Sequence, residues 1–119
     1  MKKILVVDDE PDIRKYLLLR LQKRGFSTVS AKDGMEALEL LRQDPPHLVL
    51  LDIKMPRLSG YDVLREMRKD EKLMHIPVIF VTAHADTRSE QENDIEANDL
   101  LLKPFETEDL FVKIQKHIL

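Results

Sequence analysis

The chain has 119 residues, of which 43% are hydrophobic and 34% are charged, with a net charge of -3 and no cysteine. This length suits one domain over 1–119 and leaves no room for a second, and the missing cysteine excludes disulfides and thiolate metal sites. The balanced, slightly acidic composition argues against disorder and against direct nucleic-acid contact. The first apolar stretch ends at Asp8, too early for a signal peptide or a spanning helix, so we expect a cytoplasmic protein that does not enter a membrane.

The first part of the chain alternates apolar runs with segments of helical periodicity. The run 4–7 predicts a buried strand, and apolar residues then recur at helical spacing between Pro11 and Gly25. The segment 26–31 predicts a second short strand. A second helix is expected from Gly34 until two prolines stop it.

The same alternation continues to the last residue. Strands are expected at 48–51, 78–81 and 100–102, and helices are expected after the loop 55–60, at 86–98 and from about Glu106. The helix at 86–98 offers little apolar surface, so we expect it to be short or mobile. Almost purely apolar strands that alternate with amphipathic helices predict a parallel sheet covered on both faces, in a three-layer (βα)5 fold of the α/β class.

Four of the expected strands end on polar residues. Asp8 and Asp9 follow the first strand, Asp52 follows the third, Thr82 follows the fourth and Lys103 follows the fifth. In an open parallel sheet, ligands bind in the crevice beyond the carboxyl ends of the strands. The fold therefore predicts that all five side chains meet in one pocket.

These five groups together predict a metal-assisted phosphoryl acceptor. Carboxylates about 4 Å apart repel by roughly 4 kcal/mol per pair, so the cluster needs cations. Lys103 supplies one positive charge and a divalent ion two more, and the hard oxygen ligands favour Mg2+, with Mn2+ as a second choice. Asp52 stands alone at its strand end and is the candidate nucleophile, whereas Asp8 and Asp9 suit a metal. Lys103 and Thr82 would contact the phosphoryl oxygens.

Four ordered motifs make the chain resemble a known family. They read ILVVDDE at 4–10, DIKMP at 52–56 followed by Gly60, VTA at 81–83 and KPF at 103–105. In this order and spacing they resemble the receiver domain of two-component response regulators, as in the stand-alone chemotaxis and sporulation regulators. The resemblance covers essentially the whole chain. It implies a flavodoxin-like, doubly wound parallel sheet of five strands in the order 2-1-3-4-5.

The resemblance also implies how the site works. Asp52 would accept a phosphoryl group from a phosphohistidine on a sensor histidine kinase or a histidine phosphotransfer protein. The metal would be held by Asp9, Asp52 and the backbone carbonyl of Lys54, with Asp8 acting mainly through a bound water. Such a domain assists its own phosphorylation and dephosphorylation, so we expect a phosphoacceptor and not an enzyme.

Signal output is expected to start at Thr82. By the resemblance, Thr82 moves toward the phosphoryl group and shifts the face made by the fourth helix and fifth strand, which a downstream protein or output domain then binds. The Lys103–Pro104 peptide is often cis in the family. The family's switch aromatic usually lies three residues before the lysine, where this chain has Leu100, and the common glycine before the fifth strand is Glu96. We therefore expect a remodelled output face beside a complete acceptor site.

Two other functions fit parts of the pattern. A phosphatase of the haloacid dehalogenase type also combines carboxylates, magnesium, threonine and lysine, but its nucleophile belongs to a D-x-D spacing, whereas Asp8 and Asp9 are adjacent. Turnover of a small phosphoester would support it. The other alternative is a receiver-like interaction module that binds its partner independently of phosphate. Equal partner affinity with and without acyl phosphate would support that module.

Overall fold

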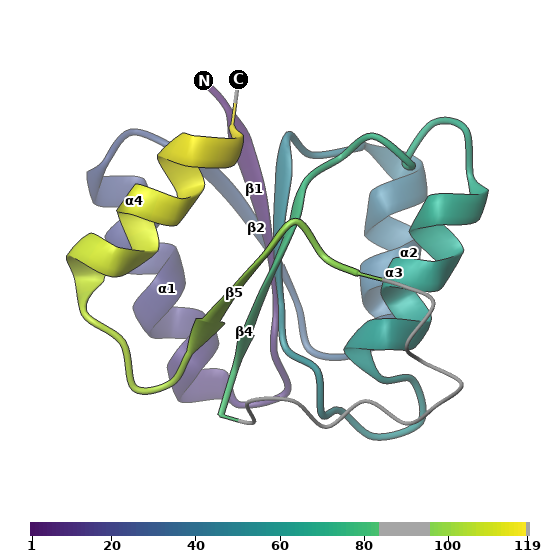
Figure 1. The fold of residues 1–119 in the computed structure, drawn as a ribbon, viewed down its shortest axis with the longest axis horizontal. Coiled ribbons are helices and arrows are strands. Elements are labelled where there is room, and N and C mark those ends of the chain that lie inside the picture. Colours follow the sequence, from purple (N-terminus) through teal and green to yellow (C-terminus); the bar gives the residue numbers. More distant parts are fainter. Residues whose placement is uncertain (84–95, 119) are drawn as a thin grey trace.

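The computed structural model describes residues 1–83 and 96–118, which form a three-layer α/β sandwich (Figure 1). Its elements in chain order are β1 (Lys3–Val7), α1 (Pro11–Lys23), β2 (Ser27–Ala31), α2 (Gly34–Gln43), β3 (Leu48–Leu51), α3 (Gly60–Lys69), β4 (Val78–Thr82), β5 (Asp99–Leu102) and α4 (Thr107–His117). Each predicted strand is confirmed to within one residue at either end. None of the helices in these two ranges is long and apolar enough to cross a bilayer.

The five strands form one parallel sheet in the order β2-β1-β3-β4-β5. This confirms the predicted strand order and the flavodoxin-like architecture. Parallel neighbours need crossover connections, and the helices that make them cover both faces of the sheet. Figure 1 shows α1 and α4 on one side of the strands and α2 and α3 on the other.

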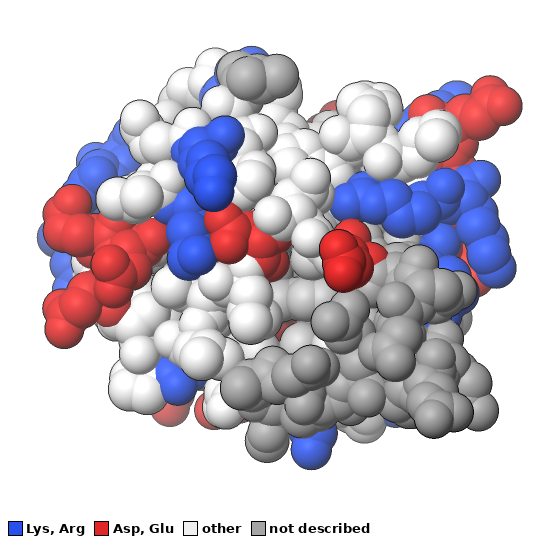
Figure 2. All heavy atoms as spheres, in the orientation of Figure 1, with Lys and Arg blue, Asp and Glu red and all other residues white. Residues whose placement is uncertain are grey.

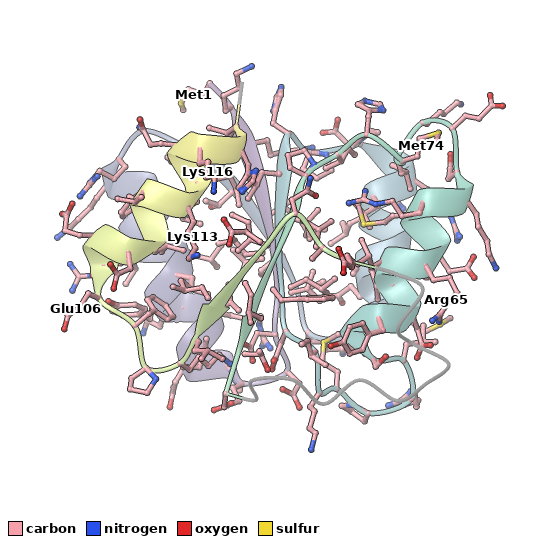
Figure 3. All side chains as sticks on the ribbon, in the orientation of Figure 1. Met1, Arg65, Met74, Glu106, Lys113 and Lys116 are labelled. Carbon is pink, nitrogen blue, oxygen red and sulfur yellow. The ribbon has the colours of Figure 1, made fainter. Side chains whose placement is uncertain are left out.

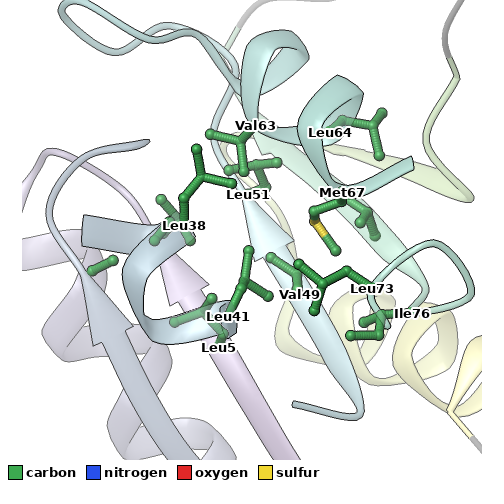
Figure 4. Packing of buried hydrophobic residues seen from close by; sticks show 14 of the residues in the cluster. Leu5, Leu38, Leu41, Val49, Leu51, Val63, Leu64, Met67, Leu73 and Ile76 are labelled. Atoms are coloured by element: carbon green, nitrogen blue, oxygen red, sulfur yellow. The ribbon is translucent and has the colours of Figure 1, made fainter. Parts of the chain in front are cut away.

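Two apolar clusters fill the spaces between the sheet and its helices. Side chains along β1 alternate between them, since Leu5 and Val7 pack toward α2 and α3, whereas Ile4 and Val6 pack toward α1 and α4. Figure 4 shows the first cluster from close by. Full burial of an aliphatic side chain is worth about 1.5–3 kcal/mol, so these two layers supply the rigid frame on which the strand ends rest.

Local sequence signals set the helix ends. The Asp33 carboxylate accepts a hydrogen bond from the main-chain N–H of Glu36 and caps α2. Ser59 and Asp62 form a reciprocal capping box at the start of α3. Gly25 follows α1 with φ of +89°, a conformation that glycine adopts without a steric penalty, so the helix ends there as predicted.

The helix predicted at 86–98 falls mostly outside the described residues. Only 96–98 of that segment are described, and they are not helical, so the prediction that the helix reaches Asn98 is wrong. The reason is a pair of hydrogen bonds to the start of β4. The main-chain N–H of Asn98 donates to the carbonyl of Val78 at 2.9 Å, and the Asn98 side-chain oxygen accepts from the N–H of Val78 at 2.8 Å.

Candidate functional site

Four strands end at the same edge of the sheet and bring polar side chains to it. Asp8 follows β1, Asp52 follows β3, Thr82 ends β4 and Lys103 follows β5. The strand pairing continues to these residues, because the N–H of Asp52 donates to the carbonyl of Val7 at 2.9 Å and the N–H of Lys103 donates to the carbonyl of Thr82 at 2.8 Å. The carboxyl ends of these strands therefore lie side by side, and the structure brings the four side chains together.

The Lys103 ammonium lies among three carboxylates. Its Nζ atom is 2.8 Å from Oδ2 of Asp8, 3.6 Å from Oδ2 of Asp52 and 3.9 Å from Oε1 of Glu10. Within the described ranges, the buried polar or charged side chains are those of Asp8, Asp52 and Thr82, all at this edge. Burying charge is costly unless it is paired, so this concentration marks the edge as the candidate functional site.

The environment of Asp52 disfavours its charged form. Burial is the largest cause and, with the negative charge of Asp8, it raises the pKa of the Asp52 carboxyl. The positive charge of Lys103 and hydrogen bonds from the Ile53 N–H, at 2.8 Å, and the Thr82 side chain act in the opposite direction without cancelling the rise. A further cation beside Asp52 would favour the carboxylate, which is the nucleophilic form.

The pKa of Lys103 is also raised, but for a different reason. Burial alone would lower the pKa of Lys103, but the hydrogen bond to Asp8 and the negative charges around it outweigh burial and raise the pKa. An unperturbed lysine is already protonated at neutral pH. Lys103 is therefore a fixed positive charge at this site.

The turn after β1 carries three carboxylates. Oxygen atoms of Asp8, Asp9 and Glu10 lie within 4.8 Å of one another, and Asp8 is buried whereas Asp9 and Glu10 are exposed. The N–H of Glu10 also donates to Oδ1 of Asp8 at 2.9 Å. Sequence reasoning placed Asp8 and Asp9 in the site and missed Glu10. The available signal was its position directly after two candidate metal ligands.

Lys54 lies beside the same acidic turn. Lys54 and Asp9 both line a hollow of about 470 Å³ next to the site. The chain returns close to this segment at Gly60, whose N–H donates to the carbonyl of Ile53 at 2.7 Å. A Cβ atom at Gly60 would lie 2.9 Å from Cα of Ile53 and closer still to the carbonyl oxygen of Asp52. Only glycine allows α3 to begin this close to the strand that carries Asp52.

The donor set fits a hard divalent cation. The carboxylates of Asp8, Asp9 and Asp52 and the main-chain carbonyl of Lys54 offer oxygen atoms, the ligands that Mg2+ and Mn2+ prefer. Negative charge exceeds the single positive charge of Lys103 in this cluster. The arrangement can therefore hold a divalent ion next to a buried carboxylate, which is the charge pattern that phosphoryl transfer requires.

The output side of the site is described only in part. Leu100 occupies the position of the family's aromatic residue on β5 and is 37% exposed. The Lys103–Pro104 peptide is cis, as the resemblance implied. The segment 84–95 lies outside the described residues, so the predicted remodelling of the output face stays a prediction.

Comparison with protein families and curated proteins gives one result. The model of the response regulator receiver domain matches residues 4–115. The chain is 43% identical over 115 residues to a probable transcriptional regulator ycf27 of Guillardia theta, a match that covers 96% of this chain and 44% of that protein. It is 33% identical over 116 residues to the DNA-binding dual master transcriptional regulator RpaA of Synechocystis sp., over 97% of this chain and 48% of that protein. The chain spans about half the length of these relatives.

Solved structures agree with the family match. Response regulator protein TrrA of Thermotoga maritima, in complex with Mg2+-BeF, is 39% identical with a TM-score of 0.88, over 99% of this chain and 100% of that chain. Chemotaxis protein CheY4 of Vibrio cholerae is 28% identical with a TM-score of 0.90, over 99% of both chains. The chain therefore belongs to the receiver domain family of two-component response regulators.

Proposed function

We propose that this receiver domain is switched by phosphorylation of Asp52, with Mg2+ as the cofactor, or Mn2+ in its place. The observation that carries the proposal is a buried carboxylate, Asp52, 3.6 Å from an ammonium that a second buried carboxylate, Asp8, holds at 2.8 Å. The raised pKa of Asp52, caused first by burial and then by the charge of Asp8, agrees with a functional carboxylate and supports the proposal beside this geometry. The relative solved with Mg2+-BeF supports the choice of metal.

The proposed donor is a phosphohistidine on a sensor histidine kinase or a histidine phosphotransfer protein. A carboxylate oxygen of Asp52 attacks phosphorus, an O–P bond forms and the N–P bond of the phosphohistidine breaks. The bonding electron pair leaves on the imidazole nitrogen, which takes up a proton. Lys103 Nζ compensates the negative charge on the phosphoryl oxygens, and the metal would neutralise the remainder when bound between Asp9, Asp52 and the Lys54 carbonyl, with Asp8 reaching it through water.

The proposed signal follows from the change of charge at Asp52. Phosphorylation replaces one negative charge by about two and adds three acceptor oxygens. Thr82 is completely buried and hydrogen-bonds to Asp52, so its hydroxyl is placed to exchange this partner for a phosphoryl oxygen. Such an exchange would bias the end of β4 and the neighbouring β5 toward a second conformation.

The proposed role is that of a phosphoacceptor that assists its own phosphorylation and dephosphorylation without turning over a separate substrate. A downstream protein or an output domain would bind the altered face. The relatives named as transcriptional regulators are about twice as long as this chain, which supports an output domain in those proteins. Because sensor kinases draw on cellular ATP, the proposed exchange takes place in the cytoplasm.

Intact-mass spectrometry tests the acceptor directly. The parent protein and Asp52→Asn are incubated with acetyl phosphate, with and without Mg2+. We expect a gain of about 80 Da that requires Mg2+ and is absent from the variant. Asp99→Asn, which removes a carboxylate remote from the site, is the matched control and should still gain mass. If the parent gains no mass across a range of donors, the phosphate-independent interaction module is favoured instead.

A further inference from the structure

Arg14, on the first turns of α1, reaches back to the acidic turn after β1. Its Nη1 atom donates to the main-chain carbonyl of Asp8 at 2.6 Å, and the guanidinium is partly buried. We propose that Arg14 is a positioning residue, which fixes the turn 8–10 so that its carboxylates face the cation. This inference rests on the proposed function, because it concerns the geometry of the same metal site.

The turn needs such support because it leaves the sheet at Asp8. The N–H of Asp8 still continues the strand pairing, donating to the carbonyl of Ala31 at 3.2 Å. Its carbonyl is then taken by the Arg14 side chain, and its Oδ1 atom accepts from the N–H of Glu10 at 2.9 Å. Arg14 therefore links α1 to Asp8, the residue that follows β1. The exposed Asp9 lies between these two elements in the chain.

Charge gives a second reason for an arginine here. Within the described residues, the carboxylates of Asp8, Glu10 and Asp52 lie around the Lys103 ammonium, and Asp9 lies next to Asp8 and Glu10. Arg14 adds a second positive charge beside the turn. A guanidinium is always charged and donates to oxygen in a fixed plane. It therefore offsets the repulsion among the carboxylates and also fixes the orientation of the turn that it contacts. With all four carboxylates ionised, the remaining charge of -2 equals what one divalent ion neutralises.

The competing interpretation is that Arg14 merely belongs to the basic surface of α1. Lys15 is its neighbour on the same helix, is exposed and carries the same charge. A docking surface for an acidic partner would use both residues in similar ways. A positioning role belongs to Arg14 alone, because its contact is with the Asp8 carbonyl.

The test measures Mg2+ affinity by isothermal titration calorimetry for the parent protein, Arg14→Gln, Arg14→Lys and Lys15→Gln. Arg14→Gln and Lys15→Gln lose the same charge at adjacent positions. We expect Arg14→Gln to bind Mg2+ roughly tenfold more weakly, as for other residues that orient metal ligands. Lys15→Gln should change affinity less than about twofold, since an exposed charge is screened by salt. Arg14→Lys keeps the charge and should recover part of the loss.

A purely structural role predicts a different result. Arg14→Gln would then lower the unfolding temperature without Mg2+ but leave Mg2+ affinity, measured well below that temperature, equal to that of Lys15→Gln. That outcome overturns the inference, and if Arg14→Gln does not fold, unchanged affinity in Arg14→Lys overturns it as well. Failure of the parent protein to bind Mg2+ contradicts the proposed metal site itself. Parent binding with no difference among the variants contradicts only the role of Arg14.

Discussion

Two ion clusters in this molecule use similar side chains but differ in the ratio of basic side chains to carboxylates. At the start of β5, the Asp99 carboxylate faces two basic side chains of α4, with Nζ of Lys113 and Nε2 of His117 each 2.9 Å away. Burial alone would raise the pKa of Asp99, but the hydrogen bonds from Lys113 and His117 outweigh burial and lower it to about 2. Figure 3 shows Lys113 on the β5 side of α4, and Figure 2 shows basic and acidic side chains in contact on this face.

The proposed acceptor site has the opposite ratio, with two carboxylates for one basic side chain. Asp8 and Asp52 share the single ammonium of Lys103, and the pKa of Asp52 is raised, chiefly by burial. The β5–α4 cluster is therefore complete in itself and fastens a helix to an edge strand. The acceptor site is short of positive charge. This difference in the ratio of charges, and not the mere presence of ion pairs, is what supports the proposal that the second cluster binds a cation.

Removing the shared cation should have the largest effect. Lys103→Met leaves Asp8 and Asp52 buried without their shared cation, so we expect the free energy of unfolding at pH 7, without divalent ions, to fall by about 3 kcal/mol. Urea denaturation followed by circular dichroism measures the loss. Lys116→Met removes an exposed lysine of α4 and should cost less than about 0.5 kcal/mol. Equal losses of unfolding free energy in the two variants would mean that Lys103 stabilises the fold no more than an exposed surface lysine does.

The β5–α4 cluster should respond to pH in the direction set by its lowered pKa. Asp99 stabilises the fold above its ordinary pKa of 3.8 and loses this contribution as pH falls toward about 2. Asp99→Asn should therefore lower the free energy of unfolding by about 1–2 kcal/mol at pH 7, and the difference should vanish near pH 2. Glu108→Gln, in the exposed pair with Arg24, should change it by less than about 0.5 kcal/mol. A pH-independent loss in Asp99→Asn would indicate lost packing instead.

The smallest effect is expected to have the opposite sign. Because the folded pKa of Asp52 is raised, folding disfavours its ionised form, and stability declines as pH rises through that pKa. Asp52→Asn should therefore stabilise the protein by about 1 kcal/mol at pH 7 without divalent ions. Mg2+ that binds the folded state stabilises it, and the variant lacks one of the proposed carboxylate ligands. Millimolar Mg2+ should therefore stabilise the parent more than the variant. Thermal unfolding with and without Mg2+ measures both changes.

The sequence predicted what depends on strand ends. Asp8, Asp52, Thr82 and Lys103 follow apolar runs, and a parallel sheet brings such positions together whatever the details of the helices. Glu10 and Arg14 were not assigned because their roles depend on how the first turn of α1 bends back toward β1. That bend is a tertiary contact, and no periodicity encodes it.

The errors have a similar origin. Asn98 was assigned to a helix, yet its side chain pairs with the main chain of Val78, 20 residues earlier. The cluster around Asp99 was not foreseen, because its partners lie 14 and 18 residues further along the chain and face it only after α4 packs on β5. Propensity reports on neighbours in sequence, whereas these contacts join segments that meet only in the folded state.

The 2.8 Å contact between Lys103 and Asp8 has a consequence for which basic residue the site accepts. An ammonium carries three N–H groups in a tetrahedral arrangement, so one can stay on Asp8 while another turns toward a new oxygen. A guanidinium directs its five N–H donors within one plane, so it can serve a second oxygen only where that oxygen lies in the same plane. If Asp52 is phosphorylated as proposed, lysine suits position 103 better than arginine would, because its ammonium can donate to two oxygens that do not share a plane.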